Sequence, residues 1–139
     1  MKGPRGARVL VVDDNVDDIE LLRLSFARVG PSCSVVGTTS TKEALGLLAT
    51  RDGRPDVVLL DWKMPSMDSP EFIRALRADP RTIGLAVLVF SSSDDPGDIR
   101  AAYAAGATAY LLKPPGLVEY ESLARDISTF WCRPVRYLG

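Results

Sequence analysis

The chain has 139 residues, a formal net charge of −1, 46% hydrophobic residues and no histidine. Its length fits one globular domain, and its near-neutral charge gives no reason to expect non-specific binding to nucleic acid or to a membrane surface. Without histidine, imidazole general bases and most zinc or copper sites are excluded, so any bound metal is expected to be a hard, oxygen-ligated ion.

The two ends and the two cysteines add little to this picture. No apolar run approaches the roughly 20 residues that span a bilayer, and the basic N-terminus is not followed by a signal-peptide cleavage site. Cys33 and Cys132 are too few for a disulfide framework and are expected to be reduced. We therefore expect a cytoplasmic, single-domain protein with a core over residues 7–130 and a tail over residues 131–139.

Apolar runs alternate with helical patterns five times along the chain. Strands are expected over residues 8–13, 34–39, 56–60, 85–90 and 108–112, and helices over residues 15–30, 40–48, 69–79, 95–106 and 117–130. Such alternation predicts an α/β fold with a doubly wound, five-stranded parallel sheet and helices on both faces. The 34–39 run is more polar than the others, which favours a place at the edge of the sheet.

Two of the expected helices begin with a recognisable cap. Asn15 precedes the first helix with Asp18 three residues on, and Ser40 precedes the second with Glu43 at the same spacing. Asp17 and Asp18 are expected to complement the dipole of the first helix rather than to bind metal.

Polar side chains follow four of the five strands. Asp13 and Asp14 follow the first, Asp61 the third, Ser91 the fourth and Lys113 the fifth. In a parallel sheet these positions share one edge, where ligands of open α/β folds bind.

Three carboxylates at one edge repel each other. Two such charges about 5 Å apart repel by on the order of 3 kcal/mol at an effective dielectric constant of 20. The cluster therefore needs a cation, or one acid must stay protonated. Mg²⁺ fits carboxylate ligands and completes its shell with phosphate oxygens, which Lys113 and Ser91 also suit. A carboxylate beside Mg²⁺ is a candidate nucleophile toward phosphorus.

In this arrangement of motifs, the chain resembles the receiver domains of bacterial two-component response regulators. The resemblance covers nearly the whole chain and is carried by the order and spacing of residues 12–15, residues 60–65, Ser91, residues 106–107 and residues 110–114. It implies the flavodoxin-like (βα)5 receiver fold with strand order 2-1-3-4-5.

The resemblance also implies a phosphoacceptor and a metal site. Asp61 would be the phosphoacceptor. Asp13, Asp14 and Asp61 would hold Mg²⁺ as the cofactor, with the backbone carbonyl of Lys63 as a further ligand. The Lys63 side chain is left open by the sequence, since it either reaches the phosphoryl group or is solvated.

Three more residues gain roles by resemblance. Lys113 would pair with the phosphoryl group, Ser91 would be the hydroxyl that moves toward it, and Tyr110 would be the aromatic that swings inward on activation. Two alternatives stay open: Ser92 or Ser93 takes the role of Ser91, and Tyr110 is a fixed core aromatic.

The implied function is a response regulator that receives a phosphoryl group from a sensor histidine kinase. Such a protein is not an enzyme beyond its own phosphotransfer and autodephosphorylation. Residues 15–18, the length and the aromatic C-terminus resemble receivers that partner bacterial phytochrome kinases. With 26 residues after Lys113, we expect signalling through protein–protein contacts and no DNA-binding output domain.

The chain departs from the receiver pattern at three points. Ser69 stands where receivers usually have Gly, and it is expected to cap the helix with Pro70 at the first helical position. Ser91 replaces the commoner Thr and keeps the hydroxyl. A second proline, Pro115, tightens the loop after Lys113. The resemblance also implies a cis peptide bond between Lys113 and Pro114.

An apolar surface near the C-terminus predicts a homodimer. Phe130 and Leu123 lie off the stripe that is expected to face the core, which suggests a partner surface formed by the fourth helix, fifth strand and fifth helix. The stripe itself comprises Leu117, Tyr120, Ala124, Ile127 and Trp131.

Three other functions were weighed. A pseudo-receiver would keep the fold and act without phosphate, but the intact acidic residues, Ser91 and Lys113 argue against it. A haloacid-dehalogenase-type phosphatase needs an Asp two residues past its nucleophile, where Lys63 stands. A flavodoxin-like flavin binder is disfavoured because carboxylates occupy the place of the flavin phosphate.

Overall fold

The computed structural model describes residues 7–29, 33–50, 54–65 and 68–131. Five parallel strands form one sheet of order β2-β1-β3-β4-β5, which confirms the predicted fold. The strands are β1 (Ala7–Val12), β2 (Cys33–Thr38), β3 (Val57–Leu60), β4 (Ala86–Ser91) and β5 (Ala109–Leu112). The helices are α1 (Val16–Val29), α2 (Thr41–Leu48), α3 (Ser69–Ala78), α4 (Pro96–Ala105) and α5 (Leu117–Phe130).

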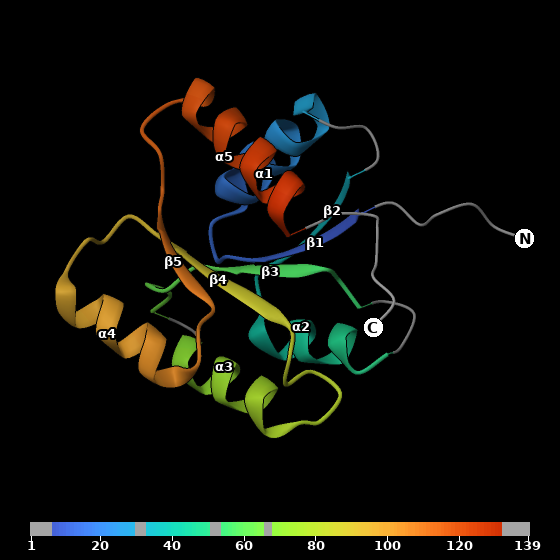
Figure 1. The fold of residues 1–139 in the computed structure, drawn as a ribbon, viewed down its shortest axis with the longest axis vertical. Helices are drawn as coiled ribbons and strands as arrows, with labels where there is room; N and C mark the ends of the chain where they lie inside the picture. Colours follow the sequence, from blue (N-terminus) through green and yellow to red (C-terminus); the bar gives the residue numbers. More distant parts are fainter. Residues whose placement is uncertain (1–6, 30–32, 51–53, 66–67, 132–139) are drawn as a thin grey trace, which may run out of the picture.

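The helices cover both faces of the sheet (Figure 1). α1 and α5 lie on one face, and α2, α3 and α4 lie on the other. Along β1 the side chains alternate, so that Val9 and Val11 pack under α1 and α5 whereas Leu10 and Val12 pack over α2 and α3. Each face of the sheet therefore has its own apolar core.

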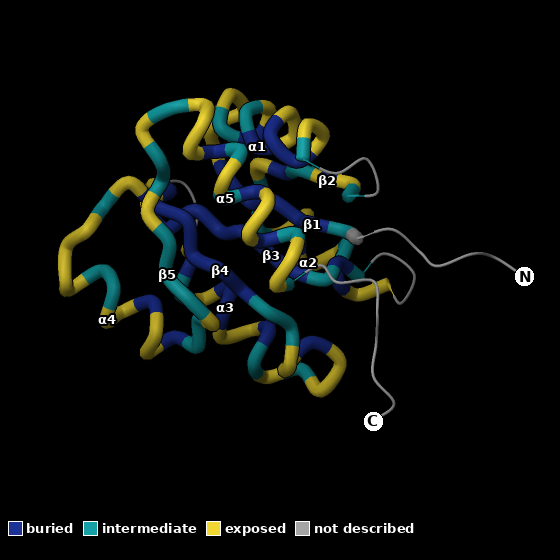
Figure 2. Tube along the Cα trace, turned by 45° about the horizontal axis from the view of Figure 1, so that its top comes forward, coloured by how far each residue is buried: buried dark blue, intermediate teal, exposed yellow. Residues whose placement is uncertain are grey.

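Burial falls from the centre of the sheet to its edges (Figure 2). All four residues of the central strand β3 are buried, as a strand covered by helices on both faces requires. β2, at one edge, alternates between buried and more exposed residues, which confirms its predicted position. β5, at the other edge, has no fully buried residue.

The ends of the helices follow local rules, with one correction. Asn15 accepts a hydrogen bond from the backbone N–H of Asp17, and Ser40 accepts one from Glu43, so both predicted caps are present. The N-cap of α3 is Asp68, which accepts from the N–H of Glu71, and not Ser69 as predicted. Both residue types are good caps, so the sequence placed the start of this helix one residue too late.

Two further predictions are wrong. The residues that the structure describes contain no cis peptide bond, so the bond between Lys113 and Pro114 is trans. Leu117 was expected to face the core but is 49% exposed, whereas Tyr120, Ala124 and Ile127 are buried as predicted. Leu117 is the first residue of α5, where the helix extends beyond the edge of the core.

Some predicted features lie outside the described residues, namely the end of the first helix at residue 30 and the tail over residues 132–139. Within the described ranges, none of the helices combines the length and apolar character needed to cross a bilayer.

Candidate functional site

The residues at the carboxyl edge of the sheet are fixed by the sheet's own hydrogen bonds. Three of them lie one position past a strand and extend the backbone ladder by one bond. Asp13 donates its backbone N–H to Thr38 O at 3.1 Å, Asp61 to Val12 O at 2.9 Å, and Lys113 to Ser91 O at 2.8 Å. The backbone at these positions is therefore fixed in the same way as the backbone of the strands.

Three carboxylates converge at this edge. Asp13, Asp14 and Asp61 each offer an oxygen, and these oxygens lie within 4.8 Å of one another. Asp13 and Asp61 are buried, at 1% and 7% exposure, while Asp14 is exposed. Two acids are thus held inside the protein and the third opens to solvent. Oxygen atoms at this spacing suit a hard divalent cation.

The ammonium group of Lys113 lies among these acids. Its Nζ is 3.1 Å from Asp13 Oδ2 and 3.5 Å from Asp61 Oδ1. Its shortest contact, at 2.8 Å, is with Asp18 Oδ2 in the first turn of α1. The Lys113 ammonium also lies 5.8 Å from the centre of the Phe90 ring, and its side chain is only 14% exposed.

One cation does not neutralise this cluster. Burial, and then repulsion from Asp13, raises the pKa of Asp61 to about 6 despite the nearby Lys113. Burial also raises the pKa of Asp13. For Lys113, burial lowers the pKa, but the hydrogen bond to Asp18 and the attraction of the other acids outweigh it, so its pKa is raised. The lysine is thus held charged while the acids retain uncompensated negative charge.

A hydrogen-bonded chain leads from the end of β4 to β5. Ser91 is fully buried, and its hydroxyl accepts a hydrogen bond from Ser93 N at 3.2 Å. The carbonyl of Ser93 accepts one from the hydroxyl of Tyr110 at 2.7 Å. Tyr110 packs, half-buried, against the core under α3 and α4. Ser92 is exposed. The structure therefore connects Ser91 to Tyr110 through Ser93.

Lys63 lies at the rim and is turned toward α4. Its Nζ is 3.1 Å from Asp98 Oδ2, and the same carboxylate oxygen accepts a 2.6 Å hydrogen bond from Ser93 Oγ. The Lys63 side chain is 60% exposed. In this structure the Lys63 side chain therefore pairs with α4.

Ser69 has a role that the sequence did not suggest. Its hydroxyl donates a hydrogen bond of 2.8 Å to the backbone carbonyl of Asp61, and the whole residue is buried. The first residue of α3 therefore fixes the backbone of Asp61 through this hydrogen bond.

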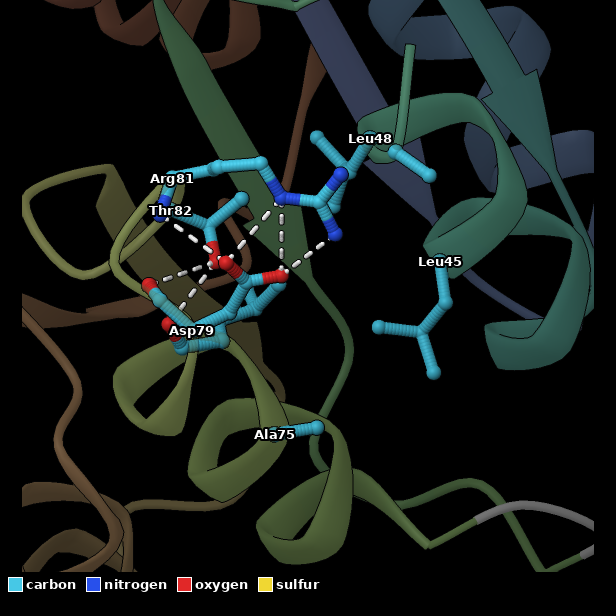
Figure 3. Close-up of a pocket in the computed structure, with 8 residues that line it drawn as sticks. Leu45, Leu48, Ala75, Asp79, Arg81 and Thr82 are labelled. Atoms are coloured by element: carbon cyan, nitrogen blue, oxygen red, sulfur yellow. Dashed lines mark hydrogen bonds and ion pairs between the residues drawn. The ribbon is translucent and has the colours of Figure 1, made fainter.

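A separate hollow of about 240 Å³ lies between α2 and α3, at the opposite end of the sheet (Figure 3). Leu45 and Leu48 line one side, and Asp79 and Arg81 form an ion pair of 2.8 Å at its rim. None of the carboxylates described above lines this hollow.

The fold is found in known proteins. A sequence profile of the response regulator receiver domain matches residues 9–124. The response regulator RPA3017, in red light signaling of R. palustris, is 30% identical with a TM-score of 0.84, covering 94% of this chain and 96% of that one. The phosphorylated cyanobacterial phytochrome response regulator RcpA is 27% identical with a TM-score of 0.81, covering 94% of this chain and 97% of its own.

Longer relatives match as well. The DNA-binding response regulator MtrA of Mycobacterium tuberculosis is 34% identical over 107 residues, which are 77% of this chain and 44% of MtrA. The chain thus spans less than half the length of that relative. The profile covers most of the sequence, and the strand order agrees with it. The chain belongs to the response regulator receiver domain family.

Proposed function

We propose that this receiver domain accepts a phosphoryl group on Asp61 from the phosphohistidine of a sensor histidine kinase. The observation that carries the proposal is the position of the Lys113 ammonium, 3.5 Å from the Asp61 carboxylate and next to two further acids. A cation and a nucleophilic carboxylate at this spacing suit an incoming phosphoryl group.

Transfer forms a bond between an Asp61 carboxylate oxygen and phosphorus. The bond from phosphorus to the imidazole nitrogen breaks, and the nitrogen keeps the electron pair. Asp61 must be ionised to attack, and its pKa of about 6 leaves it ionised at neutral pH. Lys113 and the Ser91 hydroxyl then donate hydrogen bonds to the phosphoryl oxygens. Later attack by water on phosphorus returns free Asp61 and inorganic phosphate.

The carboxylates fit a magnesium ion. Burial raises the pKa values of Asp13 and Asp61 despite the nearby Lys113, and all three acids offer oxygen ligands within 4.8 Å of one another. Asp13, Asp14, Asp61 and the backbone carbonyl of Lys63 would hold the ion. When bound, Mg²⁺ would neutralise negative charge that develops on the phosphoryl oxygens.

Phosphorylation would be read out through Ser91 and Tyr110. A Ser91 hydroxyl that turns toward the phosphoryl group gives up its hydrogen bond with Ser93 N, which is 3.2 Å long here. The Ser93 carbonyl also accepts a hydrogen bond from the Tyr110 hydroxyl, so a shift of Ser93 would free Tyr110 to swing inward. The switch thus changes the surface of α4 and β5.

That surface is also the proposed homodimer interface. Exposed apolar side chains lie on α4, β5 and α5, among them Tyr103, Leu112 and Phe130 at 49%, 51% and 72% exposure. A groove of about 470 Å³ runs between Leu111 on β5 and the end of α5. Sedimentation at tens of micromolar, with and without a phosphoryl mimic, tests this interface; a monomer under both conditions contradicts it.

The proposed kinase partner is a bacterial phytochrome, and the proposed output is protein–protein contact rather than DNA binding. Similarity to RPA3017 and RcpA, whose chains are matched over 96% and 97% of their lengths, supports this partner class. Transfer from a purified phytochrome kinase, compared with an unrelated histidine kinase, tests it.

Labelling with acetyl phosphate and Mg²⁺ tests the phosphoacceptor. We expect the wild type to gain one phosphoryl group by mass and Asp61→Asn to gain none. A wild type that takes no label, or an Asp61→Asn variant that takes as much, contradicts the proposal and leaves a pseudo-receiver.

A further inference from the structure

Asp18 makes the shortest contact with the only cation at the carboxyl-edge cluster among the described residues. The Lys113 ammonium lies 2.8 Å from Asp18 Oδ2, closer than to Asp13 at 3.1 Å or Asp61 at 3.5 Å. The first two contacts are hydrogen bonds, and the third is an ion pair without one. A residue outside the strand ends thus holds the lysine most tightly.

Local structure brings Asp18 to this place. α1 begins immediately after the Asp13–Asn15 turn because Asn15 caps it, accepting from Asp17 N at 2.9 Å. Asp18 is the third helical residue, and its side chain is 26% exposed beside Lys113. α1 also packs against α5, the helix that follows Lys113 in the chain.

The number of donors decides what this contact does. An ammonium group has three N–H bonds and no acceptor. Two of them are directed to Asp13 and Asp18, which leaves the third for the side on which Asp61 lies. Lysine has a long, flexible stem, so two fixed partners are what set the direction of its third donor.

We propose that Asp18 is a positioning residue that aims Lys113 at the phosphoryl group on Asp61. This inference rests on the proposed function and adds a residue to it. Lys113 need not leave Asp18 to act, because a phosphoryl group bonded to Asp61 projects from a carboxylate already 3.5 Å from Nζ. Without Asp18, the ammonium would settle between Asp13 and Asp61, in contact with the acids that must receive the ligand.

The test uses beryllium fluoride, a phosphoryl mimic, added with Mg²⁺ to the full chain. Trp62 follows Asp61 directly and is the reporter, in a Trp131→Phe background that removes the other tryptophan. The comparison is Asp18→Ala against Asp17→Ala. Both variants remove one carboxylate from the same helical turn, but Asp17 is exposed and its carboxylate does not contact Lys113.

We expect Asp18→Ala to weaken beryllium fluoride binding on the order of tenfold, the size of one lost charge-assisted hydrogen bond. Asp17→Ala should change it by less than about twofold, since a solvated charge in the same turn is screened. Asp18→Glu, which keeps the charge, should restore most of the affinity. Asp18→Asn serves as the second variant if Asp18→Ala does not fold.

A double-mutant cycle separates positioning from a structural role. In a Lys113→Ala background, Asp18→Ala should leave beryllium fluoride affinity unchanged, because Asp18 acts only through the lysine. A full Asp18 effect without Lys113 overturns the inference. So does an equal effect of both aspartates, or a gain of affinity on losing Asp18, which would make Asp18 a competitor for the lysine.

The two proposals fail differently. A wild type that neither binds beryllium fluoride nor takes label from acetyl phosphate overturns both. A wild type that does both, with Asp18→Ala and Asp17→Ala indistinguishable, overturns only the role of Asp18.

Discussion

Two cations, at opposite ends of the same sheet, have opposite surroundings. Lys113, at the carboxyl edge, lies among the carboxylates of Asp13, Asp18 and Asp61. Arg77, at the end of α3 and the amino edge of the sheet, is surrounded by neutral oxygens. Its guanidinium donates to the carbonyls of Gly106, Ile83 and Leu85 at 2.9, 3.0 and 2.8 Å.

At the amino edge, the donors of Arg77 are paired with protein oxygens without any ligand. Arg77 joins α3 to the turns before β4 and β5, and a guanidinium has the several rigid donors that this needs. Nearby, Asp79 pairs with Arg81, and the Thr82 hydroxyl donates to Leu76 O at 2.8 Å (Figure 3). These groups hold the fold together.

The carboxyl edge is left with excess negative charge. The pKa of Asp61 is about 6, because burial, and then repulsion from Asp13, outweighs the attraction of Lys113. The difference teaches that polar groups at one end of this sheet are arranged for stability, and those at the other end are arranged to gain a ligand.

The largest expected change in stability is at the amino edge of the sheet. Arg77→Ala should lower the free energy of unfolding by roughly 3 kcal/mol, because several partly buried carbonyls lose their donor at once. Arg77→Lys should recover less than half, since an ammonium does not span the same acceptors. Urea denaturation measures both, with exposed Arg74→Ala on the same helix as control. A loss similar to that of Arg74→Ala would show that Arg77 does not join these segments.

Gly106→Ala should destabilise the same region, because Gly106 is one of the partners of Arg77. Gly106 has φ 116°, and an added Cβ would lie 2.9 Å from Arg77 Cγ and 3.3 Å from Ile73 Cγ2. We expect a loss of about 2 kcal/mol from backbone strain and displacement of Arg77. Gly46→Ala, where a Cβ meets nothing within 4 Å, is the control. Unfolding midpoints that agree for the two variants would contradict this.

Asp61→Asn should raise the free energy of unfolding, in contrast to the two substitutions above. The folded pKa of Asp61, about 6, lies above its ordinary value of 3.8, so ionised Asp61 costs stability above pH 6. Below pH 3.8 it is protonated in both states and costs nothing. Removing the charge should therefore stabilise the protein by about 2 kcal/mol at pH 7.5 without divalent metal.

That gain should shrink as the pH falls from 6 toward 4, and unfolding curves at several pH values with a chelator would show it. Asp68→Asn, which removes the charge of an exposed helix cap that is not part of the cluster, is the control and should change stability little, because Asn caps a helix about as well as Asp. A loss of stability in Asp61→Asn at pH 7.5 would show that the acids do not repel each other as described.

The smallest effect is expected at Lys63. Its ion pair with Asp98 is largely solvated on the lysine side, at 60% exposure, and exposed pairs of this kind contribute little. Lys63→Ala should leave the urea midpoint unchanged within error, in contrast to Arg77→Ala. A clear shift of the midpoint would place Lys63 with the stabilising cations.

The sequence predicted the fold and the meeting of the three carboxylates because both follow from short rules. Apolar runs that end in acids place those acids at one sheet edge, whatever the details of packing. It did not predict the contact between Asp18 and Lys113. An acid in the first turn of a helix already has a sufficient explanation in the helix dipole, so nothing marked Asp18 as special.

Other misses have similar causes. Asp68 and Ser69 are adjacent and both cap well, so only the structure decides between them. The acceptors of Arg77 are backbone carbonyls up to 29 residues away, and a carbonyl leaves no trace in a sequence. The spacing of Asn15 and Asp18 does suggest one usable rule. An acidic residue in the first turn of a helix that follows a strand should be checked for a cation at the same edge of the sheet.

The placement of Lys113 after an edge strand has a consequence for how the site can fail. The acids follow β1 and β3, which have neighbours on both sides, whereas Lys113 follows β5, a four-residue strand paired only with β4. Edge elements of this kind open locally at lower free energy than the centre of a sheet. Amide hydrogen exchange should therefore be faster in β5 than in β3. Each such opening would carry the lysine away and leave the acids in place, so that the ion pairs of Lys113 are lost before the fold is.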